Sequence, residues 1–221
     1  MEKISAVAVF DFDETIVLEN SLGLLFSYVV GSRAYVFKAL PAIVAYIKKP
    51  GSFYDLRKLI KRRLYHACLL NQPANNLIHA GSFAAKKLTL NPRVVELLKR
   101  HAESKDFLLI ATASPWQYVQ SILESLDIPF NKVIGTELAS SSDDGHKEGD
   151  IEEGDRVLTG SLVGEECSRD HKWQRIEACF KELNIGDCPV VAYGNRPDDV
   201  QMLEQVNTGY VVSGRNITLF K

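Results

Sequence analysis

The sequence has little of what marks secreted, nucleic-acid-binding or metal-thiolate proteins. Its formal net charge is only −2 at pH 7, so it has no basic field that would recruit nucleic acid. Its first residues do not have the pattern of a signal peptide. Its few cysteines lack the spacing of a disulfide framework or a thiolate metal site: Cys68, Cys167, Cys179 and Cys188. We therefore expect a cytoplasmic protein with reduced thiols and no nucleic-acid partner.

The sequence also lacks an apolar run long enough to cross a membrane. Its longest apolar region covers residues 20–49, where Arg33, Lys38 and Pro41 interrupt every window of the ~20 apolar residues that spanning requires. Two interpretations of this region stay open, the packed face of a helical subdomain or a surface for weak contact with a membrane or lipid. The basic stretch 52–70 that follows is either a solvated helix face or a site for an anionic substrate or head group.

What is present is the composition of an ordinary globular protein. The chain of 221 residues, 46% hydrophobic and 24% charged, can bury a substantial core. A buried strand is predicted at residues 4–10, and from residue 91 onward short apolar strands alternate with helices. Those later strands are predicted at 106–112, 132–135, 189–193 and 210–212. This alternation predicts an α/β fold with a doubly wound parallel sheet.

Two stretches interrupt the alternation of strands and helices. Residues 18–88 are largely helical, so we predict a core of residues 1–17 and 89–221 with residues 18–88 inserted as a helical cap. Residues 139–156 are polar and acidic without periodicity, which predicts a loop. The strand-like segment 157–163 is predicted to return from that loop as the second arm of a hairpin.

Polar residues collect where the predicted strands end. The first strand runs into "VFDFDET", which contains Asp11 and Asp13, and the second runs into Thr112, Ala113 and Ser114. The fourth is followed by "GNRPDD", and a lysine lies on the preceding helix; these supply Asn195, Asp198, Asp199 and Lys172. In open parallel sheets the binding crevice lies outside the carboxyl ends of the strands, so we expect these groups to converge there.

This combination of residue types suits phosphoryl transfer. Neighbouring aspartates and further oxygen ligands suit Mg²⁺, which would relieve their mutual repulsion. Asp11 can then attack phosphorus to give an aspartyl-phosphate, and Asp13 can act as general acid and base. Thr112 and the Ala113 N–H can bind phosphoryl oxygens, while Lys172 supplies positive charge.

Each of these residues also has a purely structural interpretation. The aspartates alone could lie in a solvated turn, and Lys172 could be a surface lysine. Thr112 and Ser114 could cap the helix that Ser114-Pro115 begins, and for Ser114 we predict that role. It is the presence of all four segments in order that favours a phosphoryl-transfer site.

The order "VFDFDET", "LLIATAS", Lys172 and "YGNRPDD" resembles the four motifs of the haloacid dehalogenase superfamily of phosphatases, over nearly the whole chain. The phrasing "IATASPWQYV", "HKWQRI" and "AYGNRPDDVQML" is similar to the phosphoserine-phosphatase-like branch, with its helical cap. The resemblance implies that Asp11 is the nucleophile and a Mg²⁺ ligand. It also implies that Asp13 is the acid and base, with its backbone carbonyl on the metal, and that Thr15 fixes their loop.

The fourth motif departs from the family pattern. Asn195 falls where a direct metal carboxylate is expected; its amide oxygen can still bind Mg²⁺ but brings no charge. The resemblance implies that Asp199 holds metal-bound water, and Asp198 could compensate for Asn195. The cap has no evident match to the acidic residue that recognises an amino-acid substrate, although Glu19 lies near. Phosphoserine is therefore not the favoured substrate.

We therefore expect a Mg²⁺-dependent phosphatase that acts on a phosphate monoester, either a small ester or a phospholipid head group. An alternative is a degenerate, noncatalytic relative that binds a ligand or a membrane, for which Asn195 and the apolar cap are the arguments. A phospho-acceptor receiver domain is disfavoured by the large insertion after the first strand.

Overall fold

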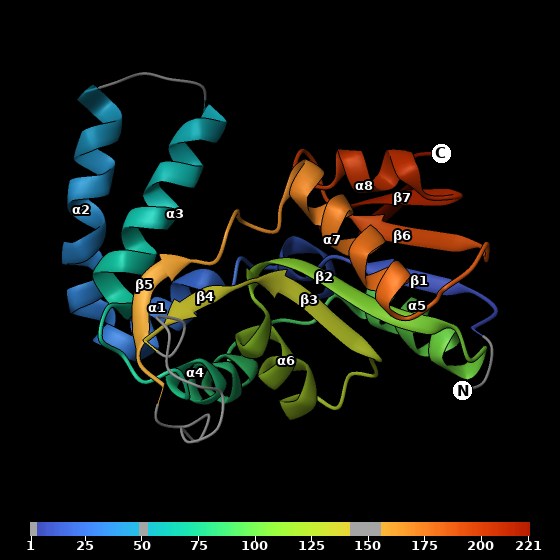
Figure 1. Ribbon diagram of the computed structural model, residues 1–221, viewed down its shortest axis with the longest axis horizontal. Helices are drawn as coiled ribbons and strands as arrows, with labels where there is room; N and C mark the ends of the chain where they lie inside the picture. The colour runs from blue at the N-terminus through green and yellow to red at the C-terminus, as the bar shows by residue number, and fades with distance from the viewer. Residues whose placement is uncertain (1–3, 49–52, 142–155) are drawn as a thin grey trace.

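The structure, a computed structural model, describes residues 4–48, 53–141 and 156–221. Its centre is a six-stranded sheet in the order β3-β2-β1-β6-β7-β8, in which all neighbouring strands are parallel except β7 and β8. The strands are β1 (Val7–Phe10), β2 (Phe107–Pro115), β3 (Lys132–Thr136), β6 (Val190–Gly194), β7 (Thr208–Ser213) and β8 (Asn216–Leu219). The predicted α/β fold with a doubly wound parallel sheet is therefore confirmed (Figure 1).

The apolar run of the first strand is explained by helices on both faces of the sheet. Val7 and Val9 pack into a cluster with residues of α7 (Arg169–Glu182) and α8 (Val200–Gln205). Ala8 and Phe10 pack into the opposite cluster, with residues of α5 (Pro92–Glu103) and α6 (Trp116–Ser125). Successive side chains of a strand point to opposite faces, so a central strand covered on both sides must be apolar at every position.

Among the described residues, four α-helices lie between the first strand and α5. They are α1 (Leu22–Val30), α2 (Ser32–Lys48), α3 (Phe53–Leu69) and α4 (Asn76–Ala85). We call α1–α4 the helical cap. α2 and α3 stand side by side and project away from the sheet (Figure 1). The two connections to the core also lie side by side, since the Leu18 N–H donates to the Thr89 carbonyl at 2.9 Å. The boundaries of the cap at residues 18 and 88 stay a prediction.

The long apolar region at the start of the cap forms two helices. They are separated at Gly31, whose φ of 81° lies in the left-handed region that favours glycine. Pro41, which we expected to punctuate the region, lies inside α2. Among the described residues no helix is long and apolar enough to cross a membrane.

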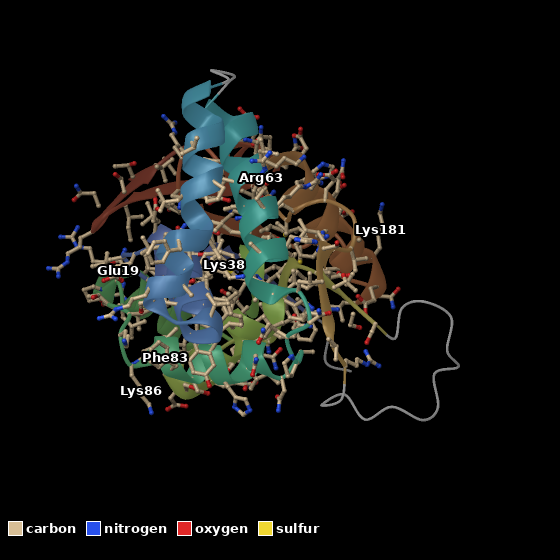
Figure 2. All side chains as sticks on the ribbon, turned by 90° about the vertical axis from the view of Figure 1, so that its left-hand side faces the viewer. Glu19, Lys38, Arg63, Phe83, Lys86 and Lys181 are labelled. Atoms are coloured by element: carbon tan, nitrogen blue, oxygen red, sulfur yellow. The ribbon has the colours of Figure 1, made fainter. Side chains whose placement is uncertain are left out.

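The exposure of the two helices differs. In α1, Leu25 and Phe26 are buried, whereas α2 exposes a row of apolar side chains: Val36, Phe37, Leu40 and Val44. Lys38 of α2 donates a hydrogen bond to the Ala67 carbonyl of α3, which ties the two helices together (Figure 2). The region is therefore a packed face in α1 and a solvent-facing one along part of α2.

A hairpin follows β3, as predicted. β4 (Leu138–Ser140) pairs antiparallel with β5 (Leu158–Leu162), and β5 packs against the end of α3. Of the acidic loop predicted between these strands, residues 142–155 lie outside the described residues.

The prediction that the last strand is residues 210–212 is wrong. That segment is part of β7, and β8 follows it as an antiparallel edge strand. Only the Ile217 side chain of β8 is partly buried, so the segment lacks the apolar run that marks the other strands.

Candidate active site

The candidate site lies where the strand order reverses. From β1 the chain moves to β2 and β3 on one side, and later to β6 and β7 on the other. The carboxyl ends of β1 and β6 therefore flank the crevice expected at such a switch point. Asp11 follows β1 and Asn195 follows β6, and the Asp11 N–H donates to the Tyr193 carbonyl at 2.9 Å. The last residue of β6 is a glycine, and a larger residue would not fit, because a Cβ at Gly194 would lie 2.7 Å from the Asp199 side chain.

A buried lysine joins two aspartates at this edge. Lys172 is only 1% exposed, and its Nζ donates to Asp11 Oδ1 at 2.8 Å and to Asp199 Oδ1. The other oxygen of Asp199 accepts the Asn195 N–H at 2.9 Å. Lys172 is therefore not the surface lysine of the structural interpretation, and three of the predicted residues form one buried cluster.

The cluster carries more negative than positive charge. Burial and the charge of Asp199 raise the pKa of Asp11 to about 7, although Lys172 acts in the opposite direction. Burial disfavours the charged form of Lys172, but Asp11 and Asp199 together raise its pKa above the ordinary value for lysine. When both carboxylates are ionised, they and the one ammonium leave a single negative charge in a buried site, which a bound cation would neutralise.

Asp13 is held by residues from both sides of the crevice. Its Oδ1 accepts the N–H of Ser21, just before α1, at 2.6 Å, and its Oδ2 accepts the Ser114 hydroxyl at 2.6 Å. The predicted capping role of Ser114 is wrong, since α6 begins at Trp116 with Pro115 at its N-cap. Ser114 ends up beside Asp13 because β2 continues to Pro115 instead of giving way to a helix.

The other predicted phosphate-binding residues lie close by. Ala113 lines the crevice, whereas Thr112 is fully buried and is not among the described residues that line it. The Thr112 hydroxyl accepts the Ser114 N–H at 3.1 Å. Thr15 donates to Asp11 Oδ2 at 3.2 Å, which fixes the Asp11 carboxylate to its own loop. The role of Thr112 toward phosphate stays a prediction.

Oxygen atoms suited to a metal ion meet at Asn195. Its Nδ2 lies 2.9 Å from the Asp13 carbonyl oxygen and 3.5 Å from Asp11 Oδ2. Rotating the Asn195 amide by a half-turn would place its Oδ1 where Nδ2 now lies. The Asp11 carboxylate, the Asp13 carbonyl and the Asn195 amide would then each present an oxygen to the same space, and this donor set fits Mg²⁺. Among the described residues no cluster of three or more His, Cys, Asp or Glu side chains is arranged to hold a metal. The fit therefore depends on the carbonyl and the amide.

Asp199 and Asp198 do not join this group of oxygens directly. Both Asp199 oxygens are engaged, by Lys172 and by the Asn195 N–H. Asp198 pairs with Arg57 of α3, Nη1 to Oδ2 at 3.2 Å, and lies 3.7 Å from the Arg169 Nε. The expectations that Asp199 holds metal-bound water and that Asp198 compensates for Asn195 stay predictions.

The basic face of α3 contacts the acidic rim of the core. Arg57 pairs with Asp198, Lys61 with the buried Glu166, and both Lys58 and Arg62 with Glu165. These residues were expected to be either solvated or free to bind an anion. Their actual partners are carboxylates from a distant part of the chain, a pairing for which the sequence gives no signal.

The crevice is small and polar. Its volume is about 40 Å³, and Asp11, Asp13, Lys172 and Asn195 are among its lining residues, together with Arg57 and Lys61 from the cap. Glu19 is instead bound at the connection to the core, where its Oε2 accepts the Thr89 N–H at 3.0 Å (Figure 2). A larger cavity of about 930 Å³ lies against β3, α6 and α7, but it contains none of the predicted catalytic residues. The residue types that line the crevice, rather than its volume, identify it as the candidate site.

Comparisons with known proteins show the family and the fold of this chain. The profile of the haloacid dehalogenase-like hydrolases matches residues 8–204. A protein of unknown function from Bordetella pertussis Tohama I has a similar structure, with a TM-score of 0.68 and 16% identity over 94% of this chain and 89% of that chain.

Two structures of phosphoserine phosphatase are also similar. A phospho-aspartyl intermediate analogue has a TM-score of 0.57 and 18% identity over 94% of this chain and 86% of that one. A substrate-bound complex has a TM-score of 0.56 and 17% identity over 95% and 86% of the two chains. No curated protein sequence matches this chain. At these identities the structures show a shared fold.

Proposed function

The chain belongs to the haloacid dehalogenase-like hydrolases, and from this premise we propose that it hydrolyses phosphate monoesters through an aspartyl-phosphate intermediate on Asp11, with Mg²⁺ as cofactor. The observation that carries the proposal is the buried contact of Lys172 with Asp11 and Asp199, beside the oxygens that converge on Asn195. A buried cluster with excess negative charge next to a polar crevice suits an anionic substrate only when a cation accompanies it.

In the first step a carboxylate oxygen of Asp11 attacks phosphorus, and the bond from phosphorus to the alcohol oxygen breaks. Asp13 gives its proton to the departing alcohol. Lys172 stabilises negative charge on Asp11 and on the transferring group. In the second step Asp13 takes a proton from water, whose oxygen attacks phosphorus and releases Asp11 and inorganic phosphate.

The chain's own residues would also hold the cofactor. Asp11, the Asp13 carbonyl and Asn195 would bind Mg²⁺ directly, with Asp199 acting through Lys172 and the Asn195 backbone. When bound, Mg²⁺ would neutralise phosphate charge and the repulsion between the carboxylates. Ser21 and Ser114 orient the Asp13 carboxylate toward the crevice, and Ala113 offers its N–H to a phosphoryl oxygen.

A small phosphate ester is the proposed substrate class. The phosphoserine phosphatase named as substrate-bound is a relative that acts on such an ester. Weak lipid contact through the cap is a further part of the proposal, supported by the exposed apolar row of α2. The noncatalytic alternative rests on the apolar cap and on Asn195, whose amide brings no charge to the metal site.

The proposal is tested by measuring release of inorganic phosphate from 4-nitrophenyl phosphate with and without Mg²⁺. We expect turnover only with the metal, and Asp11→Asn should lower it by at least about 10³-fold because the nucleophile is removed. Asp127→Asn is the matched control, since Asp127 is exposed and is not among the described residues that line the crevice. Absence of turnover by the wild type across a broad panel of phosphate esters would support the noncatalytic alternative.

A further inference from the structure

A second cavity lies in the helical cap directly beside the crevice. Its volume is about 230 Å³, and its apolar wall comes from α1, α2 and α3: Leu22, Gly23, Phe26, Tyr35, Ile60 and Leu64. Asn20, Arg57 and Lys61 line both this cavity and the crevice, so the two spaces share a wall. We call the second cavity the cap chamber.

The wall of the cap chamber is shaped by packed rings and aliphatic side chains. Phe26 stacks on Tyr35 with 5.8 Å between ring centroids and meets Tyr65 edge-on at 5.5 Å. Phe26 and Leu64 are both buried, so their packing fixes the shape of the chamber. A preformed cavity with such walls favours an apolar ligand group, since little rearrangement is needed to fill it.

The cations at the shared wall already have partners. Arg57 pairs with Asp198 at 3.2 Å, and Lys61 pairs with Glu166, which is itself buried. A second anionic group of a substrate would have to compete with these carboxylates. The amino and carboxylate groups of an amino acid would lose water against the apolar wall without gaining partners there.

The two cavities differ in size as well as in polarity. The crevice, at about 40 Å³, has room for little more than the reacting group, whereas the chamber measures about 230 Å³. A cavity of roughly 150 Å³ lined by similar side chains suffices to bind benzene. We propose that the cap chamber binds an apolar alkyl or aryl group of the substrate's alcohol while the phosphoryl group lies at Asp11. This inference rests on the proposed function and narrows its substrates to monoesters of apolar alcohols.

Binding of alkylphosphonates tests the inference independently of turnover, because their C–P bond is not hydrolysed. Affinities of ethyl-, butyl- and hexylphosphonate are measured by calorimetry in the presence of Mg²⁺. Each methylene placed in the chamber should tighten binding about threefold to fourfold, the fold-change that corresponds to ~0.8 kcal/mol. The matching series of alkyl phosphates should show the same rise in kcat/KM, because leaving-group chemistry barely changes along it.

Gly23 provides a way to fill the chamber. A Cβ at this position would lie 3.7 Å from the Tyr35 hydroxyl oxygen, an ordinary contact, so a larger side chain extends into the cavity. Gly23→Leu should reduce the hexyl-to-ethyl affinity ratio to near one, and Gly23→Ala, which keeps most of the space, should reduce it only in part. Gly186→Leu is the matched control, since a Cβ there meets no atom within 4 Å, and it should keep the wild-type ratio.

The outcomes separate the inference from the proposed function. If ethyl phosphate is hydrolysed but neither affinity nor kcat/KM rises with chain length, the chamber inference is wrong and the phosphatase stands. If phosphonate affinity rises with chain length and the rise is lost in Gly23→Leu, but no ester is hydrolysed, the chamber stands and the proposed function is wrong. If no phosphonate binds to the wild type, the chamber inference is also wrong.

Discussion

The charges at the sheet edge and the charges on the cap are held in opposite ways. At the sheet edge, Lys172, Asp11 and Asp199 are at most 4% exposed, and Lys172 contacts both aspartates directly. On the cap, Arg62 and Lys58 reach Glu165 through pairs that water can enter. Breaking a buried pair leaves an uncompensated charge, whereas an exposed pair contributes little. The ion pairs at the sheet edge are therefore costly to break, whereas the exposed ion pairs of Lys58 and Arg62 with Glu165 can be exchanged for contacts with water at low cost.

Removing the charge at the centre of the sheet edge should have the largest effect. In Lys172→Met two buried carboxylates face each other without a cation, so we expect a loss of about 3–5 kcal/mol in the free energy of unfolding. Urea denaturation measures this loss, and the phosphatase assay should show no turnover. Lys181→Met on the same helix is the control, because Lys181 is exposed and should change little (Figure 2).

The loss in Lys172→Met should also depend on pH. Burial and Asp199 already raise the pKa of Asp11 to about 7, and removal of the ammonium would raise it further. An acid with a raised pKa in the folded state binds its proton more tightly there, so stability increases as the pH falls through that pKa. The variant should regain part of the lost stability between about pH 8 and pH 5. A loss that is independent of pH would show that packing, and not the unpaired charge, is its cause.

Replacing Ser114 tests whether the orientation of the Asp13 carboxylate contributes to turnover as much as the charge of Lys172 does. Ser114→Ala removes a 2.6 Å hydrogen bond to the Asp13 carboxylate, a bond worth about 1.5–3 kcal/mol when one partner is charged. We expect kcat for 4-nitrophenyl phosphate to fall by roughly tenfold or more, with KM little changed. Ser125→Ala, on the surface of α6, should leave both constants as they are. An unchanged kcat in Ser114→Ala would mean that Ser21 alone orients Asp13.

Sequence patterns predicted the sheet edge better than the cap. Asp11 and Asn195 could be placed because each directly follows a parallel strand, and parallel strands bring their carboxyl ends to one edge of the sheet. Ser114 was missed because Ser-Pro is also a common start of a helix, and only the length of β2 decides between the two. The partners of Lys61 and Arg57 depend on how the cap lies on the core, which local patterns do not encode. Pro41 lies inside α2 although proline disfavours the interior of a helix, so its position could not be predicted from the residue type alone.

Two ion pairs between cap and core differ from each other in exposure, as the sheet edge differs from the cap. The side chains of Lys61 and Glu166 are 19% and 8% exposed, whereas those of Arg62 and Glu165 are 46% and 40% exposed. Double-mutant cycles with alanine should give a coupling energy of about 1 kcal/mol or more for the first pair and a clearly smaller coupling energy for the second. Stability measured by urea denaturation at low and high salt should show the second coupling disappearing first. Equal couplings would mean that the cap–core contact is uniformly hydrated.

The smallest effect on stability is expected on the outer face of α2. Phe37 is 72% exposed, so Phe37→Ser should change the free energy of unfolding by no more than about 0.5 kcal/mol. If this face contacts lipid, the variant should bind vesicles containing anionic lipid several-fold more weakly, because an apolar anchor is lost beside basic residues. Leu219→Ser on β8 removes a similarly exposed side chain outside the cap and should leave vesicle binding unchanged. Strong destabilisation by Phe37→Ser would instead favour the other interpretation of this apolar region, a face that is packed in the folded protein. The contrast between a buried sheet edge and an exposed cap would then hold for the charged face of α3 but not for α2.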